Sequence, residues 1–244
     1  AKLAAQFAAA AVVLASGLTV EIVGNDAFAT ALGLVWLVGI TNAFNLIDGI
    51  DGLAGGIGFM SLITLGLFLT RSGDANTALI AFALAGGILA FLYFNFNPAK
   101  IFMGDTGSLL LGFVIAVLCI RLMQVSNTAA VPVLSHAPVV VLGIVLIPVF
   151  DTLRVFTVRI WRGRSPFEAD RTHIHHLLTN QGFSHGFAAK LICFLHGFVL
   201  IEVYWCRWLK PEFALAVLIA FMLFSTLLLK KWSVIFRFKR SGSL

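Results

Sequence analysis

The chain has 244 residues, of which 60% are hydrophobic and only 11% are charged, and its formal net charge is +6. A water-soluble domain has about a quarter of its residues charged, so this composition excludes a soluble globular fold. The apolar residues form continuous runs, whereas the strands of a membrane barrel would show short alternating segments. We therefore predict an all-α fold, a polytopic bundle of transmembrane helices.

Eight apolar stretches approach the roughly 20 residues that a helix needs to cross a bilayer. They cover residues 3–22, 30–47, 53–70, 78–95, 106–125, 138–160, 188–206 and 212–230. No repeat or low-complexity linker divides them, so we expect residues 1–244 to form a single integral membrane domain. The cysteines lie in or beside these spans without metal-ligand spacing and are expected to be small buried hydrophobes.

The positive charge follows the expected topology. Lys and Arg residues gather on the side that holds both ends of the chain and the 161–187 loop, and the positive-inside rule places that side in the cytoplasm. Basic residues so placed attract anionic headgroups. Because no basic patch is interleaved with aromatic residues, membrane lipids are expected as partners and nucleic acid is not.

A first polar cluster closes the second expected span. Residues three apart are neighbours on a helix, and glycines that follow both aspartates favour ending the helix at the membrane surface. Carboxylates at membrane depth are costly and usually functional, although a solvated helix end is an alternative interpretation. The polar stripe consists of Asn42, Asn45, Asp48 and Asp51.

A second cluster runs from Asn95 to Ser108 and includes Phe102 and Asp105. Asp105 directly precedes an apolar span, so it is either the N-cap of that helix or a group that holds a phosphate or phosphate-bound metal at the helix N-terminus. Separate aspartates in an oxygen-rich site suit Mg²⁺, which borrows phosphates for the rest of its shell. Phe102 is a candidate stacking surface for a base, or an ordinary interfacial phenylalanine.

A third cluster, Arg159–His176, combines arginines with His173, His175 and His176. Ser165–Glu168 has the pattern of a capping box that starts a short helix. Arginines suit bidentate phosphate contacts, so the loop is predicted to bind an anion; a zinc site on the histidines is the competing hypothesis.

One further pair lies at the end of the sixth expected span. Asp151 and Arg154 are one helical turn apart, so we predict an ion pair between them, with a structural role. Carboxylates for a metal and basic groups for phosphates, all at one membrane surface, favour phosphoryl transfer between a lipid phosphate and a cytoplasmic substrate. A secondary transporter is the rival class, but such proteins place their sites near the bilayer midplane.

Three segments resemble the polyprenyl-phosphate N-acetylhexosamine-1-phosphate transferase superfamily. They are NAFNLIDGIDGLA at 42–54, NFNPAKIFMGDTGSLLLG at 95–112 and SPFEADRTHIHHLL at 165–178. The last is similar to the WecA-type branch, the undecaprenyl-phosphate N-acetylglucosamine-1-phosphate transferases. The resemblance implies a multi-pass enzyme of the bacterial inner membrane, with its active site facing the cytoplasm, that moves a sugar-1-phosphate from a UDP-N-acetylhexosamine to undecaprenyl phosphate. That reaction would begin the assembly of a cell-envelope polysaccharide.

The resemblance also implies roles for individual residues. Asp105 matches the ligand of Mg²⁺, for which Mn²⁺ can substitute, and Asp48 and Asp51 match an acidic catalytic pair. The histidine motif is implied to engage the diphosphate, with His175 and His176 counted as catalytic. Substrate-binding roles are implied for Lys2, Asn45, Asn95, Phe102, Arg171 and His173.

The sequence departs from the family in one respect. The family has an adjacent Asp-Asp motif, and no such dipeptide occurs here. We expect the chain to be a piece of a longer protein, preceded by about three further spans that carry this motif, and the piece alone to be inactive. The sequence leaves open which hexosamine epimer is transferred and whether the protein forms a homodimer. It also leaves open whether transfer is direct or passes through an aspartyl intermediate.

Overall fold

A computed structural model describes residues 2–20, 26–128, 134, 136–165, 173–207 and 209–241, with the side chains of 127–128 and 228–241 excepted. Throughout these residues the secondary structure is helical, without a strand, so the all-α prediction is confirmed. The helices are α1 (Lys2–Ala15), α2 (Asp26–Ile47), α3 (Leu53–Arg71), α4 (Ala75–Asn95), α5 (Gly104–Thr128), α6 (Ala137–Ile144), α7 (Leu146–Trp161), α8 (Ile174–Thr179), α9 (His185–Cys206) and α10 (Pro211–Ser241).

Five of these helices, α2, α3, α4, α5 and α9, are long and apolar enough to cross a membrane. A sixth span results if α6 and α7 are counted as one, and the apolar helices α1 and Pro211–Leu227 are shorter. The chain is therefore a multi-pass membrane protein by composition and helix length. The eight spans expected from sequence are not reached by this criterion in the described part of the chain.

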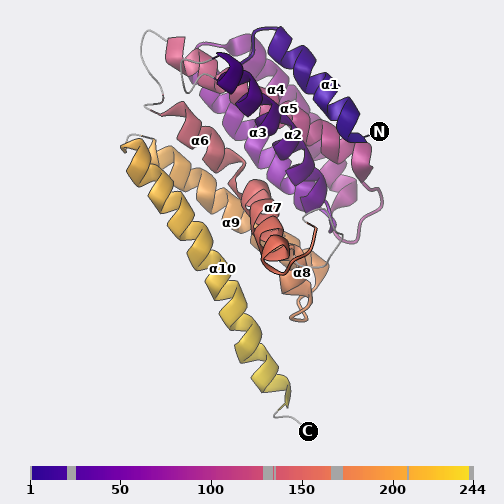
Figure 1. The fold of residues 1–244 in the computed structure, drawn as a ribbon. Helices are drawn as coiled ribbons and strands as arrows, with labels where there is room; N and C mark the ends of the chain where they lie inside the picture. The colour runs from indigo at the N-terminus through magenta and orange to yellow at the C-terminus, as the bar shows by residue number, and fades with distance from the viewer. Residues whose placement is uncertain are drawn as a thin grey trace.

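Helix α3 lies at the centre of the bundle, between α4, α5 and α9 (Figure 1). Of its apolar stretch 67% is buried inside the protein, against 22% for α4. Small residues allow this close approach: the Cα of Gly55 faces Leu92 of α4, and that of Gly58 faces Leu111 of α5. The outward face of α4 is left for lipid.

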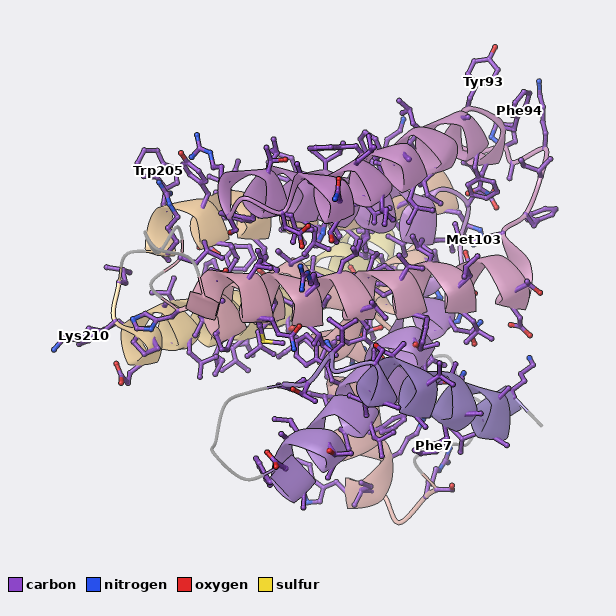
Figure 2. All side chains as sticks on the ribbon, turned by 90° about the horizontal axis from the view of Figure 1, so that it is seen from above. Phe7, Tyr93, Phe94, Met103, Trp205 and Lys210 are labelled. Carbon is purple, nitrogen blue, oxygen red and sulfur yellow. The ribbon has the colours of Figure 1, made fainter. Side chains whose placement is uncertain are left out.

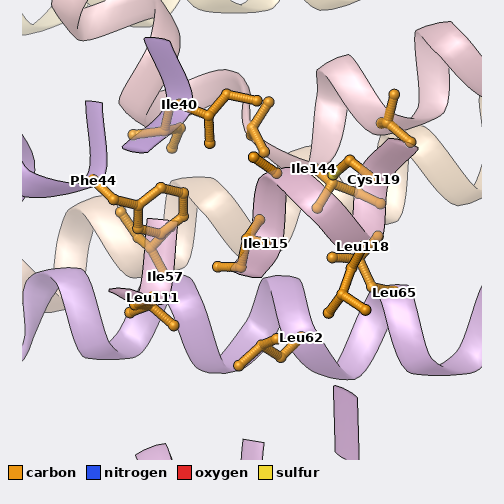
Figure 3. Close-up of a cluster of buried hydrophobic side chains, with 14 of the residues drawn as sticks. Ile40, Phe44, Ile57, Leu62, Leu65, Leu111, Ile115, Leu118, Cys119 and Ile144 are labelled. Atoms are coloured by element: carbon orange, nitrogen blue, oxygen red, sulfur yellow. The ribbon is translucent and has the colours of Figure 1, made fainter. Parts of the chain in front are cut away.

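Side chains from four helices meet in the core (Figure 3). Phe44 of α2, Leu62 of α3, Ile115 of α5 and Ile144 of α6 are all fully buried. Between helices in lipid, such packing supplies the attraction that apolar burial supplies in water. Cys119 also belongs to this core and is fully buried, as predicted for a small hydrophobe.

The expected span at 138–160 is not one straight helix. It is divided at Val145 into α6 and α7, which are bent by 74°. Pro148 explains the break, because proline has no N–H to donate to the carbonyl four residues earlier and its ring crowds that carbonyl. The bend turns α7 toward α2, against which it packs.

The bundle has two ends that bring different segments of the chain together. Tyr93, Phe94 and Met103 lie at one end, and Trp205 and Lys210 at the other (Figure 2). At the Tyr93 end α2 and α4 finish and α3 and α5 begin, so the polar segments between them are neighbours. Aromatic side chains at both ends are typical of the two membrane interfaces.

Candidate active site

Asp105 is the point at which three distant parts of the chain meet. Its Oδ1 accepts a hydrogen bond from Asn45 Nδ2 at 2.9 Å, and its Oδ2 pairs with the ammonium group of Lys2. Helix α5 begins at Gly104, so Asp105 lies inside the first turn and the N-cap interpretation is wrong. The partial positive charge of the helix N-terminus favours a carboxylate there.

Asn45 is held in place by a second contact. Its Nδ2 also donates to Ser108 Oγ at 2.9 Å, and Ser108 in turn donates to the carbonyl of Gly104 at 3.0 Å. One turn earlier, Asn42 donates to Gln6 Oε1 at 2.7 Å and so ties α2 to α1. The hydrogen bonds of these amide side chains connect α2 to α1 and to α5 close to Asp105.

Asp48 faces the same region as Asp105. Helix α2 ends at Ile47, as the glycines predicted, and Asp48 lies in the turn that follows. Burial and the nearby charge of Asp105 raise the pKa of Asp48 to about 6. The two negative charges repel each other across an open site, and a bound cation would reduce this repulsion.

Asp51 and Asn95 hold the loop between α4 and α5. Asp51 Oδ2 accepts from Asn97 Nδ2 and from the backbone N–H of Ala99, both at 3.1 Å. Asn95 is buried; its Oδ1 accepts from the N–H of Gly52 at 3.0 Å and its Nδ2 donates to the Ile101 carbonyl at 2.8 Å. Both residues thus position the loop, and the direct roles implied for them stay predictions.

The cavity that results has a volume of about 300 Å³ and a polar lining. Phe102, whose side chain is 77% exposed, stands at its edge. An apolar cavity of about 390 Å³ between α4 and α5 adjoins it and shares Phe102 and Met103. The polar cavity is lined by Asn45, Asp48, Gly49, Ile50, Asp51, Asn95, Phe102, Met103, Gly104 and Asp105.

The histidine segment is anchored by Asp151. The predicted ion pair with Arg154 is present, at 2.7 Å. Asp151 also accepts from His173 Nδ1 at 2.9 Å and from the backbone N–H of Ile174 at 3.0 Å, although it is 2% exposed. This anchor was not predicted from the sequence. Spacing pointed to Arg154 alone, and the only available signal was an acid within a membrane span that needed more than one partner.

His175 lies behind the Asp48–Gly49 turn. Its ring fills the place that a Cβ of Gly49 would occupy, and its exposed fraction is 2%. Burial, followed by the neighbouring charge of His176, lowers the pKa of His175 to about 4, so the ring is neutral at pH 7. A neutral ring supports the turn and can exchange a hydrogen bond, but it cannot act as a cationic clamp for phosphate.

Other predictions for this segment have different outcomes. His176 is half-buried beside His175, with ring centroids 4.2 Å apart. Arg171 and most of the capping box lie outside the described residues. Within the described part of the chain, no group of three or more His, Cys, Asp or Glu side chains is placed to hold a metal ion.

The donor chemistry nevertheless fits Mg²⁺. This ion needs one or two carboxylates and completes its shell with water and substrate phosphates. Asp48 and Asp105 both line the cavity and would supply hard oxygen ligands, and the Lys2 ammonium group pairs with Asp105. Magnesium binding by Asp105 therefore stays a prediction with a suitable site.

Comparisons with known proteins identify relatives of the chain. Residues 1–123 match the family model described as glycosyl transferase family 4. The chain is 40% identical over 168 residues to a probable undecaprenyl-phosphate N-acetylglucosaminyl 1-phosphate transferase of Bacillus subtilis, covering 69% of this chain and 45% of that protein. It is 35% identical over 230 residues to the undecaprenyl-phosphate alpha-N-acetylglucosaminyl 1-phosphate transferase of Yersinia pestis, covering 90% and 61%.

A third relative has a different prenyl group in its name. It is the decaprenyl-phosphate N-acetylglucosaminephosphotransferase of Mycolicibacterium smegmatis, 38% identical over 181 residues, covering 66% of this chain and 43% of the relative. The chain thus spans about half the length of the relatives it matches. The matched range, residues 1–123, contains Lys2, Asn45, Asp48, Asp51 and Asp105. The chain belongs to glycosyl transferase family 4.

Proposed function

We propose that the full-length protein transfers N-acetylglucosamine-1-phosphate from UDP-N-acetylglucosamine to undecaprenyl phosphate and releases UMP. A phosphate oxygen of the lipid attacks the β-phosphorus of the nucleotide sugar. The new P–O bond forms as the bond from that phosphorus to the oxygen bridging the α-phosphate breaks, and this oxygen leaves with UMP. The names of the relatives support the reaction.

One observation carries the proposal: Asp48 and Asp105 line a single polar cavity at one end of a membrane bundle, and Lys2 pairs with Asp105. Phosphoryl transfer depends on positioning and on neutralising charge, which this cavity is built to do. A bound Mg²⁺ would neutralise the charge that spreads over the diphosphate. Lys2 pairs with Asp105 beside the cavity, so if Asp105 held a metal ion, the Lys2 ammonium group would be available to a substrate phosphate.

The adjoining apolar cavity suits the acceptor lipid. It lies between two membrane-spanning helices and meets the polar cavity at Phe102 and Met103. A prenyl phosphate needs such an arrangement, with a charged head in a polar site and its chain in an apolar one. We place the first prenyl units between α4 and α5, and the uracil ring against the exposed face of Phe102.

The location of the site also supports a transferase over a transporter. Its residues come from helix ends and from the turns that join them, rather than from the middle of the spans where transporters bind their substrates. We propose that this end faces the cytoplasm of a bacterial inner membrane, where the nucleotide sugar is made and where the basic residues of the sequence gather.

The test is a transfer assay on the full-length protein with radiolabelled UDP-N-acetylglucosamine, undecaprenyl phosphate and Mg²⁺. Asp105→Asn should lower kcat by about 100-fold or more, as loss of a charged group that stabilises a transition state does. Asp26→Asn, a matched change in the first turn of α2, should leave kcat unchanged. Full activity of Asp105→Asn would contradict the role of Asp105. Preferential use of another UDP-N-acetylhexosamine in competition would contradict the choice of sugar.

A further inference from the structure

A buried polar contact joins three helices at the bend between α6 and α7. Ser61 of α3 and His196 of α9 are both fully buried. Ser61 Oγ lies 3.2 Å from the carbonyl oxygen of Ile144, the last residue of α6, and 3.1 Å from His196 Nε2. Ile144 itself belongs to the central core (Figure 3). None of these residues lines the cavities at the active site.

The available donors and acceptors fix the direction of both hydrogen bonds. A serine hydroxyl has one proton, and a carbonyl oxygen can only accept, so Ser61 donates to Ile144. His196 must then donate from Nε2 to Ser61 Oγ. Its Nδ1 is therefore unprotonated, which agrees with the lack of a partner for that buried atom among the described residues.

Pro148 makes the carbonyl of Ile144 available. In an unbroken helix that carbonyl would accept from the N–H of residue 148, and proline has none. An unpaired carbonyl at membrane depth is costly. The Ser61 hydroxyl satisfies it from a neighbouring helix, at the point where α6 and α7 are bent by 74°.

We infer that Ser61 and His196 act as positioning residues: they hold the bend, and the bend sets the place of Asp151 and of the histidine segment. Asp151 lies on α7, seven residues after Ile144, and its carboxylate accepts hydrogen bonds from the His173 ring and from the backbone N–H of Ile174. His175 follows and supports the Asp48–Gly49 turn of the cavity. The link to catalysis rests on the proposed function, whereas the link between the contact and the bend does not.

The test measures the bend directly in the full-length protein. Spin labels replace Tyr93 at the end of α4 and Trp161 at the end of α7, which are 80% and 90% exposed, in a background without other accessible cysteines. Double electron–electron resonance then gives the distribution of distances between the two helices in detergent micelles. Ser61→Ala should shift or broaden this distribution.

Controls separate the contact from a general loss of packing. Thr64→Ala removes a hydroxyl one turn away that bonds only to its own helix, at Met60 O, and should leave the distribution unchanged. Ser61→Thr keeps the hydroxyl and should restore it. His196→Leu leaves the bond from Ser61 to Ile144 and should give a smaller shift. The inference is overturned if Ser61→Ala and His196→Leu both give the unaltered distribution.

The transfer assay supplies the second readout. Ser61→Ala should lower kcat about 10-fold while the KM for UDP-N-acetylglucosamine stays within a factor of two, because small misplacements of catalytic groups reduce the rate more than binding. A shifted distance with unaltered kcat would overturn the link to catalysis and keep the link to the bend. If the parent protein were inactive in the transfer assay while Ser61→Ala still shifted the distance, only the proposed function would be refuted.

Discussion

Replacement of Asp151 by asparagine tests the anchor of the histidine segment. The carboxylate accepts three hydrogen bonds, from Arg154, from His173 and from the N–H of Ile174, at 2.7, 2.9 and 3.0 Å. Asparagine keeps one oxygen, which can still accept from Ile174 and Arg154. Its NH₂ group must then face His173 Nδ1, which becomes an acceptor only if the ring changes tautomer.

The size of the effect follows from these contacts. A hydrogen bond to a charged group contributes about 1.5–3 kcal/mol, and removing one partner of a buried ion pair costs about 3–5 kcal/mol. Asparagine retains part of both interactions, so we expect a loss of about 2–3 kcal/mol. If the loss falls on the docking of residues 173–179, the equilibrium constant for docking falls about 30- to 150-fold. Transfer activity should fall as well, by at most about the same factor.

Hydrogen–deuterium exchange and the transfer assay, both on the full-length protein, measure this loss. Peptides that cover 173–179 should exchange faster in Asp151→Asn, and kcat should fall. Asp74→Asn is the matched control, since Asp74 also accepts from a backbone N–H, at Thr77, and pairs with an arginine, Arg121, at the opposite end of the bundle. Its activity and its exchange over 173–179 should be unaltered.

Unaltered exchange over 173–179 in Asp151→Asn would refute the anchoring role. If exchange became faster while kcat stayed at the parent value, the anchor would exist but the histidine segment would not belong to the active site. The two readouts therefore test the structure and its functional interpretation separately.

Three further predictions concern other parts of the chain. Gly49→Ala should lower the melting temperature in micelles, because its methyl group meets the His175 ring, and adding His175→Ala should restore it; no recovery would contradict the contact. Burial raises the pKa of Asp74, but the hydrogen bonds from Arg121 and Thr77 lower it by more. The pKa of Asp74 therefore lies below its ordinary value. Its stabilisation is present above pH 4 and lost as pH falls through the lower folded pKa, so Asp74→Asn should lower the melting temperature more at pH 7 than at pH 3. Gly87→Leu, which fills the apolar cavity, should raise the KM for undecaprenyl phosphate several-fold, and Gly86→Leu on the same helix but outside that lining should not; equal effects would contradict the prenyl site.

Much of the architecture follows from local pattern. Continuous apolar runs predicted helices that span the membrane, and glycines after Asp48 and Asp51 predicted the break between α2 and α3, where Gly52 has a positive φ of 78°. The pair Asp151–Arg154 was predicted from its spacing on one helical turn and is present. These features depend on residues a few positions apart, which the sequence displays directly.

The remaining features depend on contacts between distant residues. Lys2 and Asp105 pair across 103 positions, and His173 reaches Asp151 across 22. No periodicity of the sequence indicates such pairs. The residue types of the site could therefore be predicted from the sequence, but the contacts between them could not. The bend at Val145 was missed for another reason: an apolar run that contains Pro148 is equally consistent with a kinked single span.

The histidines show contacts that residue type alone does not predict. Their number and their neighbouring arginines predicted an anion receptor, yet His173 is used by Asp151 and His175 is buried behind the cavity wall. Desolvation keeps His175 neutral, an effect that depends on burial and has no signature in spacing. The part of the loop that includes Arg171 lies outside the described residues, so its role stays a prediction.

The most direct test is the position of the metal in the full-length protein with bound UDP-N-acetylglucosamine. Crystals grown with Mn²⁺ in place of Mg²⁺ locate the ion through its anomalous scattering. We predict a peak within direct coordination distance of Asp105, in the cavity that Asp48 also lines, with the diphosphate beside it. A peak at another place in the protein, with the nucleotide sugar bound there, would contradict the central claim.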